Sequence, residues 1–166
     1  MILKTERLEL VPLLPYQLKL WVENIPKLEK DLNCSYQAEP MEGLFLEIVK
    51  GQLEKTEKYS SDYLWHSFWF LVRNGVNVLL CGGIGGGSAD FKDIPNTDKE
   101  VEIGYGLGKE FEHNGYMTEA VQAMCKWALK QENVSHIIAE TDIDGFASQR
   151  ILQRCGFVEK RREETI

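Results

Sequence analysis

Between Glu100 and Gln131 the chain changes its hydrophobic period, and this change constrains the fold more than any other feature of the sequence. Over 100–107, apolar residues alternate with glycine or glutamate, which is typical of a β-strand. From Gly115 onward the apolar residues recur at the helical period of about 3.6 residues, which predicts an amphipathic helix. Because the polar segment 108–114 joins a strand directly to a helix, this unit indicates an α/β protein.

The rest of the chain completes one domain, which we place at residues 1–166 because no repeat and no linker interrupts the pattern. Helical spacing starts at Pro15, and Pro26 weakens or divides that helix. The polar stretch 88–98 is expected to be a loop. The other expected elements are strands at 8–12, 65–72, 76–84 and 134–141, helices at 41–59 and 146–155, and a last extended piece from Phe157.

A run of glycines at 82–87 invites comparison with a phosphate-binding loop. Such a loop joins a strand to a helix whose free N–H groups point at the anion. Here a polar loop and another strand follow, so the context does not fit. We interpret Gly85, Gly86 and Gly87 as the end of a hairpin or a β-bulge.

The start of the helix at Gly115 has the context that the glycine run lacks. A helix N-terminus attracts phosphate through its dipole and its unpaired N–H groups, and Gly115 permits close approach of the backbone. Asn114 is equally suited to cap the same N–H groups. The residues alone leave both roles open.

Composition excludes several classes of function. The chain has 26 acidic and 19 basic residues and a net charge of −7, which disfavours a binder of nucleic acid or anionic membranes but allows a local basic pocket. Its four cysteines and three histidines are too scattered to suggest a metal site. The first residues lack the apolar stretch of a signal peptide. We therefore expect a cytoplasmic protein that binds no metal, nucleic acid or membrane.

Four segments carry a family pattern, in order and at matching spacing: TERLEL at 5–10, VEIGY at 101–105, NGYMTEA at 114–120, and Ser148 followed by Gly156 and Phe157. Together they resemble the GNAT superfamily of acyl-CoA-dependent N-acyltransferases, and the first is similar to the branch of ribosomal-protein N-terminal (alanine) acetyltransferases. The resemblance implies a GNAT fold, with a central mixed sheet of six to seven strands, about four flanking helices, and a splay between the fourth and fifth strands.

The resemblance also implies that acetyl-CoA, the cosubstrate, lies in that splay. Its pantetheine would pair with the fourth strand, and its pyrophosphate would lie on the loop that follows. The cofactor-binding residues implied in this way are Gly106, Leu107, Glu112, His113, Asn114, Gly115, Tyr116, Met117, Thr118, Gly145 and Arg150.

The chain departs from the family's pyrophosphate signature, R/Q-x-x-G-x-G/A. Glu112 stands at the basic or amide position, where its charge repels phosphate unless it faces away, and Met117 stands at the last, small position. Gly145 replaces an Asn, and Leu152 occupies the position where many members carry a Tyr general acid. The departures at Glu112, Met117 and Gly145 support an alternative, a non-catalytic acyl-CoA-binding or regulatory protein with a degenerate site, whereas the ribosomal-protein branch that the chain resembles often lacks the Tyr as well. A plain interaction protein without CoA affinity is a third hypothesis.

Acyl transfer from a thioester to an amine needs a deprotonated amine, a stabilised oxyanion and a protonated leaving thiolate. The resemblance makes Glu102 the candidate base, directly or through a water, because related enzymes often place a carboxylate on the fourth strand. Glu102 also shares a strand face with Gly104 and Gly106, which leaves space beside it, and its alternative role is that of a surface-facing strand residue. Ser148 is the candidate proton donor, and a helix cap is its alternative role. We expect an acetyl-CoA-dependent N-acetyltransferase acting by direct attack on a primary amine, either a protein N-terminus or a small amine. A homodimer is left open.

Overall fold

The structure is a computed structural model that describes residues 1–36, 41–73, 83–107 and 115–162, with the backbone alone at 83–86 and 107. Its described strands form one mixed sheet in the order β1-β2-β4-β5-β6-β7, and β3 pairs with β5 off this path. Pairing is antiparallel except for the parallel pairs β3–β5 and β6–β7. The strands are β1 (Leu3–Lys4), β2 (Leu8–Pro12), β3 (Cys34–Tyr36), β4 (Phe68–Arg73), β5 (Gly83–Phe91), β6 (Glu100–Leu107) and β7 (His136–Ile138).

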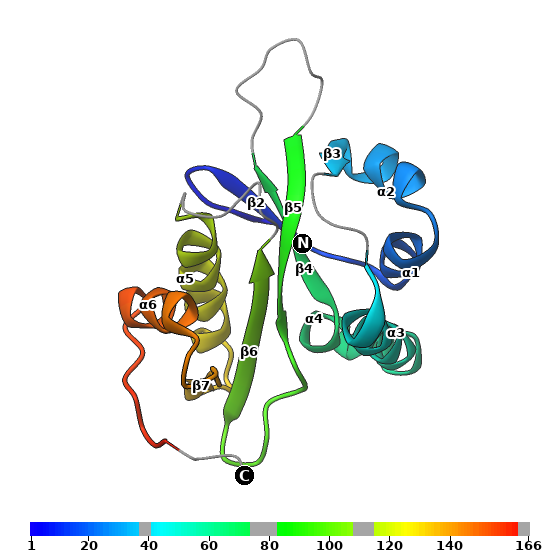
Figure 1. Cartoon of the computed structure of the whole chain (residues 1–166). Coiled ribbons are helices and arrows are strands. Elements are labelled where there is room, and N and C mark those ends of the chain that lie inside the picture. Colours follow the sequence, from blue (N-terminus) through cyan, green and yellow to red (C-terminus); the bar gives the residue numbers. More distant parts are fainter. Residues whose placement is uncertain (37–40, 74–82, 108–114, 163–166) are drawn as a thin grey trace.

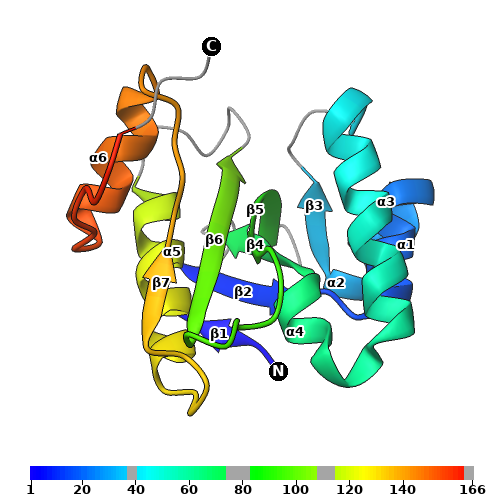
Figure 2. The same cartoon turned by 90° about the horizontal axis from the view of Figure 1, so that it is seen from below.

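Helices cover both faces of the sheet (Figures 1 and 2). The group α1 to α4 lies on one side, and α5 and α6 lie on the other. Asn24 separates the first two helices and accepts a hydrogen bond from the Lys27 N–H, so the predicted division near Pro26 is confirmed. The helices are α1 (Pro15–Glu23), α2 (Ile25–Leu32), α3 (Gly43–Lys58), α4 (Tyr63–His66), α5 (Tyr116–Leu129) and α6 (Phe146–Arg154), with a 3₁₀ turn at Ser60–Asp62.

Strand alternation divides the interior into two cores. Trp69 and Leu71 of β4 pack with Ile103 of β6 and with the apolar stripe of α5. Their neighbours Phe68 and Phe70 point to the other face, where they pack with the apolar residues of α1 to α3. Each of these side chains is at most 3% exposed, and burying one contributes about 1.5–3 kcal/mol. Ser88 and Asp90 of β5 are also buried, and they pair with Phe70 and Phe68 on the α1–α3 face of the sheet.

The sheet opens between β6 and β7. Their parallel pairing joins Glu100–Glu102 to His136–Ile138, whereas β6 continues as far as Leu107. In Figure 2 the chain leaves β7 and rises beside α5 and α6, away from the end of β6. These two strands are the fourth and fifth strands of the expected pattern, so the predicted splay is confirmed.

Several details of the expected element order were wrong. Trp65 lies in α4, because its indole reaches the core from a helical turn and contacts Phe91 and Trp127 at 5.1 Å between ring centroids. A short apolar run does not distinguish a buried helical turn from a strand. Residues 88–91 belong to β5, although their polarity suggested a loop. The strands β1 and β3 were not expected, and no strand occurs in the described part after Gly156.

The glycine run lies at a bulge, as expected. Leu71 of β4 pairs with Gly87, but the next residue, Val72, pairs with Gly85. Gly86 is therefore the extra residue of β5, and a glycine accommodates the local bend without a side chain. The predicted turn at Asn74 and Gly75 lies outside the described residues.

Candidate functional site

The first site element is the N-terminus of α5. Its N-cap residue is Gly115, with a φ of +76° that L side chains rarely adopt, so glycine is required there. Gly115 has no side chain to cap the first N–H groups, and the N-cap is one residue later than the Asn114 suggested by the sequence. The predicted residues Glu112, His113 and Asn114 lie outside the described part of the chain.

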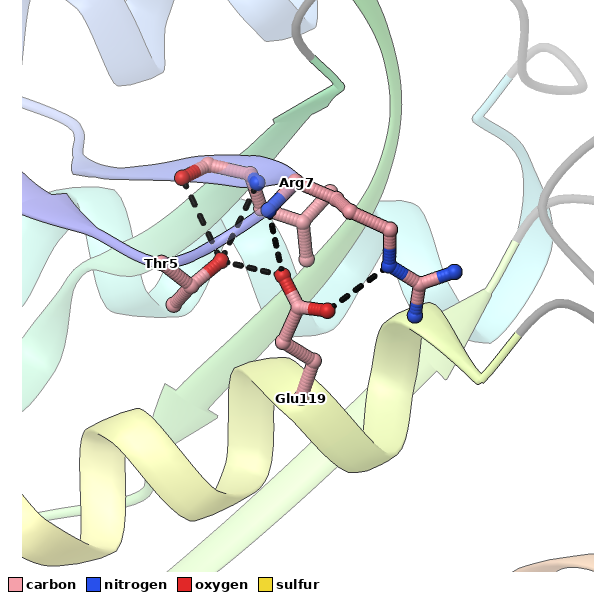
Figure 3. A network of polar contacts seen from close by, with 4 residues as sticks. Thr5, Arg7 and Glu119 are labelled. Carbon is pink, nitrogen blue, oxygen red and sulfur yellow. Dashed lines mark hydrogen bonds and ion pairs between the residues drawn. The ribbon is translucent and has the colours of Figure 1, made fainter.

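A network of polar contacts fixes this end of α5 to the turn between β1 and β2 (Figure 3). The Glu119 carboxylate accepts hydrogen bonds from the Thr5 hydroxyl, from the Arg7 backbone N–H at 2.9 Å and from the Arg7 Nε at 2.8 Å. Partial burial raises the pKa of Glu119, but these hydrogen bonds outweigh it and leave the pKa below its usual value. Two of the four family segments, 112 residues apart, are thus joined by direct contacts.

Two arginines lie beside the same helix end. The Arg7 guanidinium is 4.4 Å from the centre of the Tyr116 ring, and the Arg73 guanidinium is 6.0 Å from it. Arg7 Nη2 also lies 3.4 Å from the position that a Cβ would take on Gly115. Within the described residues, the Arg73 Nε is buried and has no hydrogen-bond partner. Positive charge therefore reaches the start of α5 from β4 and from the β1–β2 turn.

A second cluster occupies the β5–β6 face that points away from α5. Asp90 of β5 is directly opposite Gly104 of β6, so Asp90, Glu102 and Gly104 share one face of the pleated pair. The Glu102 Oε2 accepts a hydrogen bond from the Lys92 Nζ at 2.8 Å in an ion pair. The space beside Gly106 is open, since no heavy atom lies within 4 Å of a Cβ built there.

Asp90 is the most strongly perturbed acid of this cluster. Asp90 is buried, with only 8% of its surface exposed. Burial raises the pKa of Asp90 to about 7, although the Lys92 ammonium opposes the shift and the Glu102 carboxylate adds to it. A carboxyl group with such a pKa changes its protonation state near neutral pH.

Ser148 lies across the opening of the sheet from β6. Its hydroxyl is 2.7 Å from the Tyr105 hydroxyl, and the Tyr105 hydroxyl also donates to the Ser148 carbonyl at 3.0 Å. Burial raises the pKa of Tyr105, and the hydrogen bond with Ser148 partly opposes this. A pair of hydroxyl groups therefore links β6 to the first turn of α6.

The remaining predicted residues lie around these groups. Met117 is 1% exposed and turns into the α5 core, so its size does not fill the start of the helix. Thr118 has a buried hydroxyl with no partner among the described residues. Gly145 is the N-cap of α6, Arg150 is exposed on that helix, and the backbone of Leu107 pairs with Gly87.

Sequence analysis missed Asp90, Lys92 and Arg73 as site residues. The signal for the first two was present, because Ser88, Asp90 and Lys92 alternate with Ala89 and Phe91 at the strand period. Arg73 has no such signal, since its distance to Tyr116 depends on how β4 and α5 pack.

Metal-binding clusters and membrane-spanning helices are both absent from the part of the chain that the structure describes. No group of three or more His, Cys, Asp or Glu side chains there is arranged to hold a metal ion. No helix in those residues has the length and apolar content to cross a membrane.

Comparison with known proteins places this geometry in context. Residues 38–158 match the model of the acetyltransferase (GNAT) domain family. The chain is 34% identical over 90 residues to the uncharacterised N-acetyltransferase YjdG of Bacillus subtilis (strain 168), covering 54% of this chain and 50% of YjdG. The chain therefore spans about half the length of the curated relatives it matches.

Solved structures with the same fold include two complexes with a coenzyme. The ribosomal L7/L12 α-N-protein acetyltransferase RimL, bound to coenzyme A, has a TM-score of 0.60 and 19% identity, over 93% of this chain and 82% of RimL. The microcin C7 self-immunity acetyltransferase MccE, bound to acetyl-CoA and AMP, has a TM-score of 0.55 and 21% identity, over 92% of this chain and 79% of MccE. At these identities the likeness establishes the fold.

Proposed function

Since this chain belongs to the GNAT acetyltransferase family, we propose that it transfers an acetyl group from acetyl-CoA to a primary amine by direct attack of the amine on the thioester. The observation that carries the proposal is the end of β6–β7 pairing at Glu102. Beyond that point, Ile103–Leu107 pair with β5 on one side and, among the described residues, with no strand on the other. An extended thioester arm has backbone groups to pair with there.

The proposed position of the cofactor follows from the two ends of this opening. The pantetheine arm lies along β6 at Gly106 and Leu107, and the pyrophosphate lies at the N-terminus of α5, around Gly115. Unpaired N–H groups and the helix dipole favour an anion at that end. Arg73 supplies positive charge that Glu112 does not, whereas the charge of Arg7 is shared with its ion-pair partner Glu119.

The residues around the opening suit the remaining chemistry. The amine must lose a proton, and the β5–β6 face offers two carboxylates for that step, Glu102 and Asp90. The thiolate must gain a proton, for which the hydroxyl pair of Tyr105 and Ser148 lies beside the end of β6. Direct attack needs no covalent enzyme intermediate, so no cysteine is assigned to the mechanism.

For the acceptor, we place a protein amino terminus first and a small amine second. RimL, which shares the fold, acts on the N-terminus of a ribosomal protein. A buried carboxylate on the open sheet face is suited to either acceptor, because both arrive as ammonium ions.

Titration calorimetry with acetyl-CoA, and with CoA as the control ligand, tests the proposal. We expect saturable binding in the titration. In a separate unfolding experiment, acetyl-CoA at 100 times its dissociation constant should raise the free energy of unfolding by about 2.7 kcal/mol. Arg73→Gln should weaken binding about tenfold, because one hydrogen bond to a charged group contributes about 1.5–3 kcal/mol. The matched control Lys19→Gln removes an exposed charge from α1 and should leave the affinity unchanged.

Each outcome distinguishes two hypotheses. Binding followed by thiol release in the presence of an amine supports the acetyltransferase. Binding without thiol release for any amine supports the acyl-CoA-binding alternative, and no binding up to millimolar acetyl-CoA contradicts both.

A further inference from the structure

We propose that Asp90, and not Glu102, takes the proton from the acceptor amine. This inference rests on the proposed acetyl transfer and names the base for it. Three features carry it: the position of Asp90 over the open part of β6, its burial with no ion pair to another of the described residues, and the existing partner of Glu102.

The position of Asp90 is set by strand register. Asp90 lies opposite Gly104, and its Oδ1 is 3.3 Å from the position that a Cβ would take on Gly104. The carboxylate therefore lies over the backbone of β6 at Gly104. Two residues further along the strand, at Gly106, the surface is open. A side chain at Gly104 would fill this space, since the Lys92 Cε is also only 3.0 Å from that point. An amine that approaches a thioester on β6 meets Asp90 directly or through one water.

Glu102 is less suited to the same step because it already has a cationic partner. Its ion pair with Lys92 has an N–O distance of 2.8 Å, and the hydrogen bond to Glu102 raises the pKa of Lys92. Taking a proton would break this pair and leave the ammonium without its partner. Glu102 thus holds Lys92 in place, and the two charges largely compensate each other.

Burial prepares Asp90 for a cationic substrate. The ionised carboxylate is costly in a site that is 8% exposed, and an arriving ammonium compensates that cost. The charged groups that act on Asp90 are Lys92 from its own strand and Glu102 from β6, whereas its β4 neighbour, Phe68, is uncharged. On α4, the ionisable His66 lies 3.9 Å from Asp93 rather than at Asp90. With burial as the main cause, the pKa of Asp90 is about 7, near the value that suits a base at neutral pH.

The acceptor ammonium gives one proton to the Asp90 carboxylate, and the neutral nitrogen forms a C–N bond with the thioester carbonyl carbon. The C–S bond then breaks, the nitrogen loses its second proton and the leaving thiolate gains one. Asp90 releases its proton to solvent, so the products are the amide, CoA thiol and one proton.

The test compares Asp90→Asn, Glu102→Gln and the control Asp98→Asn, which changes an exposed carboxylate in the turn before β6. The probes are acetyl-CoA with peptides that begin with Ala or Ser, spermidine and an aminoglycoside, and thiol release is followed from pH 5.5 to 9.5. Asp90→Asn should lower kcat/KM at pH 7 at least 100-fold, a typical contribution of a general base, with the KM for acetyl-CoA within twofold. The wild-type inflection near pH 7 should disappear in Asp90→Asn and persist in Glu102→Gln and Asp98→Asn.

Several results would overturn this assignment. One is an Asp90→Asn variant within threefold of wild type with its inflection retained, and another is an inflection that disappears in Glu102→Gln instead. A wild-type profile without an inflection between pH 6 and 8 also overturns it, even if Asp90→Asn does not fold. A wild-type chain that binds acetyl-CoA but acetylates none of the amines overturns the proposed function together with the role of Asp90. If the wild-type chain is active, the results against Asp90 overturn only the role of Asp90 and leave the proposed function in place.

Discussion

Glu119 shows how a single residue connects distant parts of the sequence. It lies in the TEA segment of α5, and its carboxylate is bound by Thr5 and Arg7 from the TER segment (Figure 3). The contacts hold the first turn of α5, where the cofactor pyrophosphate is proposed to lie, against the β1–β2 turn. One carboxylate therefore explains why two of the four family segments contain the residues they do.

Replacing Glu119 by Gln should destabilise the protein by about 1–2 kcal/mol, since charge-assisted hydrogen bonds are lost while water screens the 41% exposed Arg7 side chain. The pKa of Glu119 is lower in the folded chain than its ordinary value of 4.5. The stability advantage of wild type over Glu119→Gln should therefore be full above about pH 4.5 and decline as pH falls through the lower, folded-state pKa.

Urea unfolding between pH 2.5 and 7 measures this difference. Glu132→Gln, which changes an exposed carboxylate after α5, is the matched control and should follow wild type at every pH. A constant difference between wild type and Glu119→Gln across this range would show that the carboxylate charge is not what stabilises the network.

At the scale of elements, the start of α5 depends on the left-handed backbone conformation of its N-cap residue, Gly115. Gly115 has a φ of +76°, whereas Gly51 lies within α3, and no heavy atom lies within 4 Å of a Cβ built on it. The same substitution at these two glycines should therefore have opposite effects on stability.

Gly115→Ala should lower the free energy of unfolding by about 1–2 kcal/mol, the cost of a left-handed conformation for an L residue. Gly51→Ala should raise it by about 0.5–1 kcal/mol, because alanine favours the helix and restricts the unfolded chain. Thermal and urea unfolding of both variants measures the pair. Equal effects of the same sign would contradict the conformation assigned to Gly115.

At the scale of the whole molecule, the opening between β6 and β7 is the feature that matters for the proposed activity. The core that α5 covers holds both sides of the opening, because it includes Val101 and Ile103 of β6 and has Ile137 of β7 packed against it. Among the described residues, the two strands pair only as far as Glu102. The opening is thus part of the folded sheet.

Hydrogen exchange should report this opening directly. Acetyl-CoA should slow amide exchange in Ile103–Leu107 of β6 and in the first turn of α5, because pantetheine pairing and phosphate binding occupy those N–H groups. Exchange in β2 should not change, and it serves as the internal control. Protection confined to α1–α3, with none in β6, would contradict the proposed position of the cofactor.

Much of the fold follows from local pattern. The period change at Gly115 and the prolines at 15 and 26 are visible in the sequence, and the structure confirms the helices and the strand that they predict. The errors arose where burial overrides local polarity or composition. Trp65 reaches the core from a helical turn, and Ser88 and Asp90 are polar residues within a buried strand.

The candidate site divides in the same way. The sequence by itself determined the family segments, the glycine at the start of α5 and the strand that carries Glu102, since each depends on neighbours along the chain. Only the tertiary structure decided that Arg7 and Arg73 lie at Tyr116, that Lys92 pairs with Glu102, and that Asp90 is buried opposite Gly104. Strand register and sheet packing bring these groups together, and the charge and pKa of each depend on neighbours that are distant in sequence.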